Sequence, residues 1–271
     1  MRIAERARAL PRPLLVELFA VANLAFLTVD VFIAHSVNAF HFTVEYVPVG
    51  FGVAGAAVLI AALALDAFDL ARPRVRRAGY VVGVASILVG VAGLFLHLRS
   101  TFFDQQTLKN LVYTAPFAAP LAFAGLGFLV LANRMVATTS REWAWWVVFL
   151  AWGGFVGNLA LSLADHAQNG FFDRREWIPV GAAAFAVGFL LLVLIRPADR
   201  ALARATLAVM GVQIVVGVLG FAWHVLADLR PGQAGLPLEI LYGAPPFAPL
   251  LFADLAVLAA LGLWDLLTFQ P

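Results

Sequence analysis

Four histidines at matching places in the chain are the residues best suited to chemistry. They are His35, His97, His166 and His224, and each lies at the end of an apolar run long enough for a membrane helix. Imidazole rings ligate haem iron, zinc, copper and non-haem iron. We therefore expect these side chains to hold haem b or a related tetrapyrrole, or otherwise a non-haem Fe, Cu or Zn ion. The alternative is that they rest at helix C-termini, where the helix dipole and water suit an imidazole.

Three stretches of the first half of the chain recur in the second half at nearly constant spacing. The clearest ends at His97 and again at His224, and six of its eleven aligned positions are identical. Chance does not easily supply three such matches in register, so we expect two copies of one unit. The matching stretches are 35–50 with 166–181, 87–97 with 214–224, and 113–121 with 242–250.

Two glycines precede each histidine of the clearest repeat, one and two helical turns before it. A helix face without side chains would leave clearance for a porphyrin or chlorin ring beside an iron ligand. Small residues at this spacing also let helices pack closely, and that alternative stays open. The glycines are Gly90, Gly93, Gly217 and Gly220.

Acidic and amide side chains flank the histidines or begin the following apolar run. They could orient the imidazoles through hydrogen bonds, or complete a non-haem metal site with oxygen ligands. Glutamates at a helix start are equally explained by the favourable effect of negative charge there, and the asparagines could be turn residues. The candidates are Asp30, Asn38, Glu45, Asp165, Asn169, Glu176 and Glu239.

Two further acids fall within apolar runs. Asp254 lies near the middle of the last run, where a charge costs roughly 2.5 kcal/mol or more on insertion scales, so we expect it inside the bundle. It is either a binding or protonatable group or a hydrogen-bond partner of Ser, Thr or Tyr, and the repeat places Gly125 at the matching position. Glu17, near the start of the first run, is expected to be solvated or paired with an arginine.

The composition requires lipid around most of the chain. Of 271 residues, 63% are hydrophobic and 13% charged, and the mean hydropathy is +0.92. Polar groups cannot cover so much apolar surface. Eight segments of about the 20 residues that a membrane helix needs predict an all-α polytopic membrane protein. The expected spans are 14–35, 47–66, 79–98, 112–132, 144–165, 178–196, 206–226 and 241–264.

Four spans in each copy give both copies the same orientation. We therefore expect two four-helix repeats, 1–137 and 138–271, related by a pseudo-two-fold axis along the membrane normal. That axis could bring His97 to His224, and His35 to His166, at shared metal ions. The arginine-rich start and the long apolar run after it favour an uncleaved first span over a signal peptide.

The distribution of positive charge predicts the orientation in the membrane. Of 18 lysines and arginines, thirteen lie at the N-terminus and in loops on the same side, and five lie on the other. The positive-inside rule then places both termini in the cytoplasm of a bacterial-type inner membrane. The histidines would lie at the outer, periplasmic face.

Several classes of function are excluded or disfavoured. The chain has no cysteine, so it has no disulfide, thiolate metal site or cysteine nucleophile. Its one lysine, Lys109, lies in a polar loop, which excludes a retinal Schiff base. It has no basic stripe for nucleic acid, and no Walker loop, dinucleotide fingerprint, HExxH or Gly-x-Ser-x-Gly motif.

Three functions remain open, and whether the protein is an enzyme is left open with them. The first is a redox or metal protein with its site at the outer face, exchanging electrons with a quinone, a periplasmic electron carrier or another membrane subunit. The second is a non-catalytic accessory subunit of a respiratory or photosynthetic complex. The third is a small-solute transporter with its site between the repeats, at Asp254 and the proline breaks.

Overall fold

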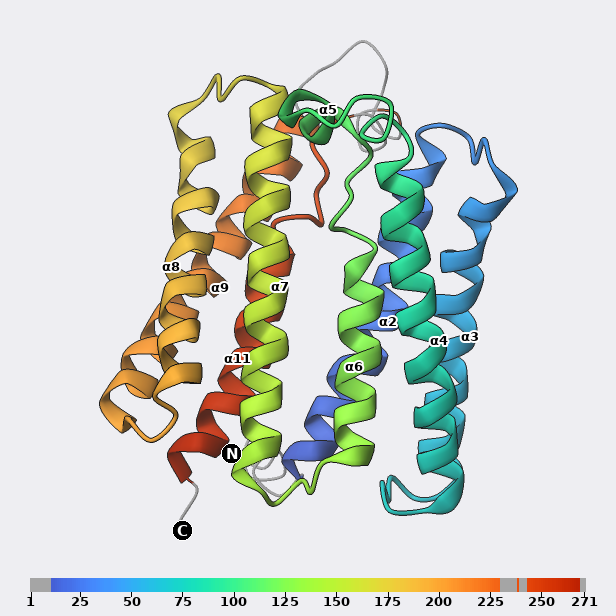
Figure 1. Cartoon of the computed structure of the whole chain (residues 1–271), viewed down its shortest axis with the longest axis vertical. Coiled ribbons are helices and arrows are strands. Elements are labelled where there is room, and N and C mark those ends of the chain that lie inside the picture. The colour runs from blue at the N-terminus through green and yellow to red at the C-terminus, as the bar shows by residue number, and fades with distance from the viewer. Residues whose placement is uncertain (1–10, 230–237, 239–242, 269–271) are drawn as a thin grey trace.

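All the regular secondary structure is helical in the part that the computed structural model describes, residues 11–229, 238 and 243–268 (Figure 1). Glu239 lies outside these residues, as do three of the N-terminal arginines. The helices are α2 (Arg12–Ser36), α3 (Tyr46–Leu65), α4 (Pro73–Leu98), α5 (Leu108–Tyr113), α6 (Leu121–Met135), α7 (Arg141–Gln168), α8 (Trp177–Ile195), α9 (Arg200–Asp228) and α11 (Leu250–Thr268), with the 3-10 turns η1 (Thr43–Glu45) and η2 (Arg174–Glu176).

Seven helices of the described residues are long and apolar enough to cross a membrane. They are α2, α3, α4, α7, α8, α9 and α11, and between 22% and 44% of each apolar window is buried inside the protein. Outward-facing side chains include Val81, Leu88 and Phe185, which are 68%, 65% and 64% exposed. Such large apolar surfaces are stable only in lipid. The protein is therefore a multi-pass helical membrane protein.

The fourth predicted span is corrected by the structure. A helix was expected over 112–132, but α6 begins at Leu121 and has only 15 residues. Pro116 and Pro120 explain the late start, because proline lacks an N–H and clashes with the preceding helical turn. At about 1.5 Å per residue, α6 covers roughly 22 Å of a hydrocarbon layer about 30 Å thick. Figure 1 shows the irregular segment before α6 descending between α4 and α7.

The eighth predicted span is corrected in the same way. A helix was expected over 241–264, but in the described residues the last helix, α11, begins at Leu250. Pro245 and Pro249 stand before it, as the matching prolines stand before α6. Irregular backbone at membrane depth is tolerated where other helices cover it.

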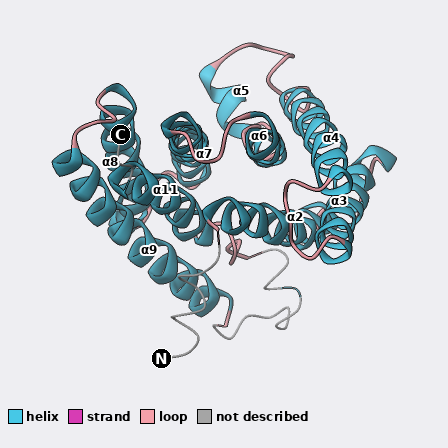
Figure 2. Ribbon diagram, turned by 90° about the horizontal axis from the view of Figure 1, so that it is seen from below, coloured by secondary structure: helices cyan, strands magenta, loops and turns pink. Residues whose placement is uncertain are grey.

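Helices α2, α6, α7 and α11 lie in the middle of the molecule, with α3 and α4 on one side and α8 and α9 on the other (Figures 1 and 2). α4 packs against α6, and α9 against α11. Two contacts join the first half of the chain to the second: α6 packs against α7, and α2 packs against α11. The C-terminal ends of α2, α4, α7 and α9 therefore lie at one end of the bundle, drawn at the top of Figure 1.

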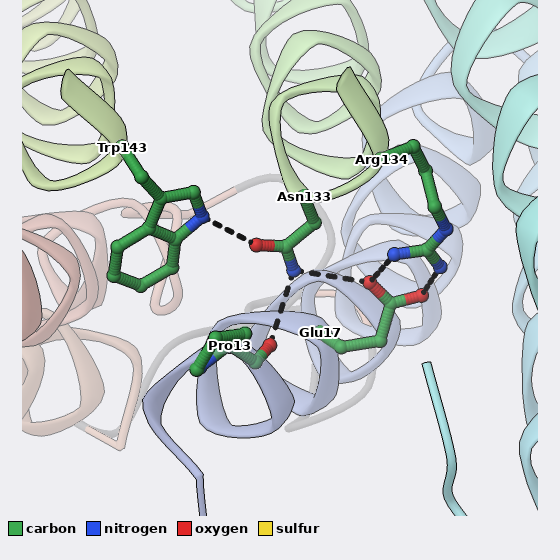
Figure 3. A network of polar contacts seen from close by, with 5 residues as sticks. All are labelled: Pro13, Glu17, Asn133, Arg134 and Trp143. Carbon is green, nitrogen blue, oxygen red and sulfur yellow. Dashed lines mark hydrogen bonds and ion pairs between the residues drawn. The ribbon is translucent and has the colours of Figure 1, made fainter. Parts of the chain in front are cut away.

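A buried polar network joins α2, α6 and α7 at the opposite end (Figure 3). The Glu17 carboxylate accepts hydrogen bonds from both terminal nitrogens of Arg134, at 2.5 and 3.0 Å. Asn133 Nδ2 donates to Glu17 Oε2 at 3.2 Å and to the Pro13 carbonyl at 3.1 Å, while Trp143 Nε1 donates to Asn133 Oδ1 at 2.9 Å. Of the two expectations for Glu17, ion pairing is correct and solvation is wrong.

The crossing of α7 with α11 lacks this polar network. A Cβ atom on Gly262 would lie 2.8 Å from Val148 Cγ2 and 3.1 Å from the Ala144 carbonyl oxygen. When the spacing of the matched stretches is continued along the chain, Gly262 corresponds to Asn133, and Val148 corresponds to Glu17. One crossing is therefore filled by hydrogen-bonded polar side chains, and the matching crossing by close contact of a glycine with apolar groups.

Candidate histidine–glutamate sites

The first candidate site is formed where α2 and α4 end. The rings of His35 and His97 meet edge to face, with centroids 6.1 Å apart and an interplanar angle of 73°. His97 Nδ1 lies 2.8 Å from the Pro116 carbonyl oxygen, and His35 Nδ1 lies 3.4 Å from Glu45 Oε2. A carbonyl oxygen can only accept, so His97 Nδ1 carries the proton and the neutral ring keeps its lone pair on Nε2.

A tight turn after α2 brings the glutamate back to the histidine. Ala39 and Phe40 adopt the left-handed backbone conformation, with φ of 53° and 51°, and the Phe40 amide donates to the His35 carbonyl at 3.1 Å. The Phe40 ring stacks on Tyr46, with centroids 4.3 Å apart. This stack holds η1 against the end of α2, so that Glu45 reaches the imidazole. Glu45 Oε2 is buried and has no hydrogen-bond partner.

The second candidate site repeats these contacts where α7 and α9 end. His166 Nδ1 lies 3.6 Å from Glu176 Oε2, and His224 Nδ1 lies 2.8 Å from the Pro245 carbonyl oxygen. His166 and His224 are close enough for their charges to interact. Glu176 Oε2 is again buried without a hydrogen-bond partner.

The surroundings of the second site include a cation–π contact that the described residues of the first site do not make. Phe171 has a φ of 51° and stacks on Trp177 at 4.0 Å, like the corresponding pair of the first site. Arg175, however, lies over the ring of Trp223, 5.7 Å from its centroid. Hydrogen bonds from Arg175 hold the pKa of the Asp173 carboxyl at about 2, so this ion pair is intact at neutral pH.

The structure corrects the expected pairing of the histidines. His97 was expected to meet His224, and His35 to meet His166, across an axis between the halves. Instead His97 lies against His35, and His166 interacts with His224. The reason lies in the helix packing: α3 contacts both α2 and α4, and α8 contacts both α7 and α9, so the two histidine-bearing ends of each half converge.

The glycines before His97 face protein and leave no room for a ring. A Cβ atom on Gly90 would lie 2.5 Å from the Ala124 amide nitrogen and 2.8 Å from the Pro120 carbonyl oxygen. A Cβ atom on Gly93 would lie 2.7 Å from Pro120 Cβ. The start of α6 therefore fills the face that the sequence analysis reserved for a tetrapyrrole.

The glycines of the second half make the same contacts with the start of α11. A Cβ atom on Gly217 would lie 2.9 Å from the Ala253 amide nitrogen, and one on Gly220 would lie 2.7 Å from Pro249 Cβ. The proposed clearance for a cofactor ring is thus wrong at all four glycines, and close helix packing is the correct alternative.

The other flanking candidates stand apart from the imidazoles. Asp30 and Asp165 form no hydrogen bond or ion pair with any residue that the structure describes. Asn38 and Asn169 are exposed residues of the turns after α2 and α7. Glu239 lies outside the described residues. Of the seven flanking candidates, the structure brings the two glutamates of η1 and η2 to a histidine.

Asp254 belongs to neither histidine site. It lies on α11, and its Oδ1 accepts a hydrogen bond of 3.0 Å from Asn23 Nδ2 of α2. Ser, Thr or Tyr was expected as the hydrogen-bond partner of Asp254, and the partner is instead Asn23, which comes from the other half of the chain. The contact bridges α2 and α11 where those helices meet.

Sequence reasoning missed the backbone carbonyls that orient His97 and His224. They belong to Pro116 and Pro245, which lie in the repeated proline-rich stretches. It also missed the aromatic stacks of Phe40 and Phe171. The signal was present, because all four residues lie inside the matched stretches, but a repeat does not show which atoms meet.

No group of three or more His, Asp or Glu side chains among the described residues is arranged to hold a metal ion by itself. A groove of about 480 Å³ lies near the start of α4, at the opposite end of that helix from His97. It has no part in the histidine sites. The groove is lined by Val58, Arg74, Arg77, Ala78 and Val81.

Comparison with known proteins adds no family to these observations. No protein-family model matches the chain, and searches of curated proteins and of solved structures give no significant match. The geometry of the two histidine–glutamate sites therefore carries the functional argument.

Proposed function

We propose that this protein is an integral membrane metal protein with one histidine-based metal site in each half. The observation that carries the proposal is that Nδ1 faces an oxygen atom in all four rings, at hydrogen-bond distance in His97 and His224 and at a longer distance in His35 and His166. One ring faces a glutamate, at 3.4 Å for His35 and 3.6 Å for His166, and the other faces a proline carbonyl at 2.8 Å. Metal-ligating histidines almost always engage their second ring nitrogen with a carboxylate or a backbone carbonyl, because this sets the tautomer and the ring orientation.

The two rings of the first site are close enough to share one ion. Their centroids are 6.1 Å apart, and two metal–nitrogen bonds of about 2.0–2.1 Å would bridge much of that separation. Each site would supply two imidazole nitrogens, and water or a substrate would fill the other positions. Such an open coordination sphere is typical of catalytic and redox sites and unlike the closed sphere of structural zinc.

The buried glutamates support a cation at both sites. Glu45 is 9% exposed, and its Oε2 has no hydrogen-bond partner. Its contact with His35 Nδ1 at 3.4 Å is an ion pair only when that ring is protonated. Beside a neutral ring the buried carboxylate is costly, and another positive charge nearby relieves that cost. A metal ion bound to the far nitrogen of the His35 ring would supply that positive charge, with the ring between the ion and Glu45. A metal ion on His166 would stabilise the Glu176 carboxylate in the same way.

The proposal takes a metal ion in preference to haem. The helix faces beside His97 and His224 are filled by Pro120 and Pro249, so a tetrapyrrole would have to displace them. Imidazole with oxygen ligands suits zinc, copper and non-haem iron. Copper or iron would allow exchange of electrons with a quinone or a periplasmic carrier, whereas zinc would confine the site to Lewis-acid chemistry.

The proposal includes two parallel four-helix repeats. It is supported by the recurrence of contacts: the histidine–glutamate pair, the histidine–carbonyl pair, the aromatic stack and the glycine–proline packing occur at matched positions of both halves. We further propose that the histidine end faces the periplasm and both termini the cytoplasm, on the strength of the arginine distribution. A site at the outer face would meet carriers or substrates without crossing the bilayer.

Metal analysis of the purified full chain tests the proposal. We expect bound Zn, Cu or Fe in the wild type, loss of about half in His97→Ala, and loss of nearly all in the variant that also carries His224→Ala. His41→Ala is the matched control, because His41 is exposed and outside both sites. A folded wild type that neither carries these metals nor takes them up would overturn the proposal, as would metal content unchanged in the double variant.

A further inference from the structure

A polar pair joins the two halves in the middle of the membrane. Asn23 is near the centre of α2, which spans Arg12–Ser36, so at 1.5 Å per residue it lies about 17 Å from the start of that helix and about 20 Å from its end. Its Nδ2 donates to Asp254 Oδ1 at 3.0 Å and to the Phe19 carbonyl at 3.1 Å. Both hydrogens of the Asn23 amide are thus used, and the bond to the Phe19 carbonyl orients the amide toward the Asp254 carboxyl group.

Asp254 has no counter-ion among the residues that the structure describes. No ion pair includes it, and the helices packed against α11, namely α2, α7 and α9, present Asn23 as its one polar partner. The nearest charged pair on the same helix is Asp265 with Arg12, which lies eleven residues or roughly 16 Å further along. An isolated carboxylate at this depth is expensive, and protonation removes the charge.

The polar pair is not needed for helix packing. The sequence repeat matches Asn23 with Gly154 and Asp254 with Gly125, which lie on α7 and α6. Those helices also pack against each other, but the two glycines do not form their contact: a Cβ atom on Gly154 would lie 2.3 Å from Leu255 Cδ2 of α11, and no atom lies within 4 Å of one on Gly125. The α6–α7 crossing therefore forms without a polar pair at the matching positions.

Aromatic rings lie on the histidine side of the pair. Phe26, one turn beyond Asn23, meets Phe247 edge to face, with centroids 5.5 Å apart, and Phe247 also lies 6.5 Å from Phe221. These rings come from α2, from the proline-rich segment before α11 and from α9. They separate the acid from the end of the bundle that holds the histidines.

We propose that Asn23 and Asp254 form a proton-binding site at the junction of the two halves. In the protonated acid, Oδ1 is the carbonyl oxygen that accepts from Asn23, and Oδ2 carries the proton. Asp254 is only partly covered, so that proton can be exchanged or donated to a ligand between α2 and α11. The site is independent of the metal sites, because no hydrogen bond or ion pair among the described residues joins Asp254 to a residue of either site.

Infrared difference spectra of wild type and Asp254→Asn test the proposal directly. At pH 7 in lipid, we expect the carbonyl stretch of a protonated carboxylic acid to be present in the wild type and lost in the variant. The asparagine replaces the neutral acid with a group of equal size that also bonds to Asn23, so the variant should fold. Asn23→Leu should shift the band, because the carbonyl loses its donor.

Asp265→Asn is the matched control on the same helix. Asp265 pairs with Arg12, so its removal should change carboxylate bands alone. As a second readout, dicyclohexylcarbodiimide should label Asp254 in membranes, and mass spectrometry should find Asp265 unmodified. The absence of a protonated carboxyl band from Asp254 between pH 6 and pH 8 would overturn the proposal. Asp254→Asn should keep the wild-type metal content, so failure here would leave the metal proposal standing.

Discussion

Glu17 and Arg134 form a two-point ion pair in which the side chains are 0% and 1% exposed. The pair joins α2 to α6, and Asn133 extends it to Trp143 of α7. Two charges buried at a helix crossing are stable together because each offsets the cost of burying the other. At the matching crossing of the second half, Val148 of α7 packs closely against Gly262 of α11 instead.

This comparison predicts how the ion pair responds to substitution. Glu17→Val alone leaves a buried arginine without its partner and should lower the free energy of unfolding by about 3–5 kcal/mol. The double change Glu17→Val with Arg134→Leu places residues of the second half at both positions. It should restore most of the loss, since an apolar replacement of a buried pair is often neutral. Thermal unfolding in detergent measures both variants, and equal loss in the single and double variants would contradict this account.

The glycine contacts predict that an added methyl group destabilises the protein at Gly90 and is tolerated at Gly125. Gly90→Ala would place a methyl group 2.5 Å from the backbone nitrogen of Ala124, so α4 and α6 must move apart, at a cost of about 1–3 kcal/mol. Gly125→Ala on α6 is the control, because no atom lies within 4 Å of its added Cβ. Melting temperatures should fall for the first variant and stay level or rise for the second. An unchanged melting temperature in Gly90→Ala would contradict close packing of α4 against α6 at this residue.

The charge beside the second metal site can be tested at Arg175. Arg175 is paired with Asp173, so the pair adds no net charge next to the site. Arg175→Val leaves the Asp173 carboxylate without its partner, and an unpaired negative charge near a cation site strengthens binding in a way that salt screens. We expect this change to tighten metal binding at the second site a few-fold at low salt. Titration of a His97→Ala variant, which retains the second site, against the same variant with Arg175→Val measures the effect, and equal affinities at low salt would contradict it.

The orientation in the membrane can be tested with single cysteines, because the chain has none of its own. Gln105 and Thr139 are exposed residues in loops at opposite ends of the bundle. A membrane-impermeant maleimide added to intact cells should label Gln105→Cys and leave Thr139→Cys unmodified until the cells are lysed. The opposite pattern would place the histidine end in the cytoplasm and remove the role of periplasmic carriers.

Local patterns were sufficient to predict the helices of this protein. An apolar run of about twenty residues predicts a membrane helix wherever it occurs, because the bilayer acts on each segment separately. Six of the spans were therefore predicted within a few residues at most boundaries. The late starts of α6 and α11 were missed, although Pro120 and Pro249 mark them, because these prolines stand among apolar residues and an apolar run does not by itself show where its helix begins.

The sequence by itself determined that the protein lies in a membrane and that His35, His97, His166 and His224 end apolar helices. Those properties depend on residues close together in the chain. Only the tertiary structure decided that histidines pair within each half, that prolines fill the glycine faces, and that Asp254 meets Asn23. Each of these contacts depends on how helices distant in the chain approach one another, and the packing of whole helix faces governs that approach.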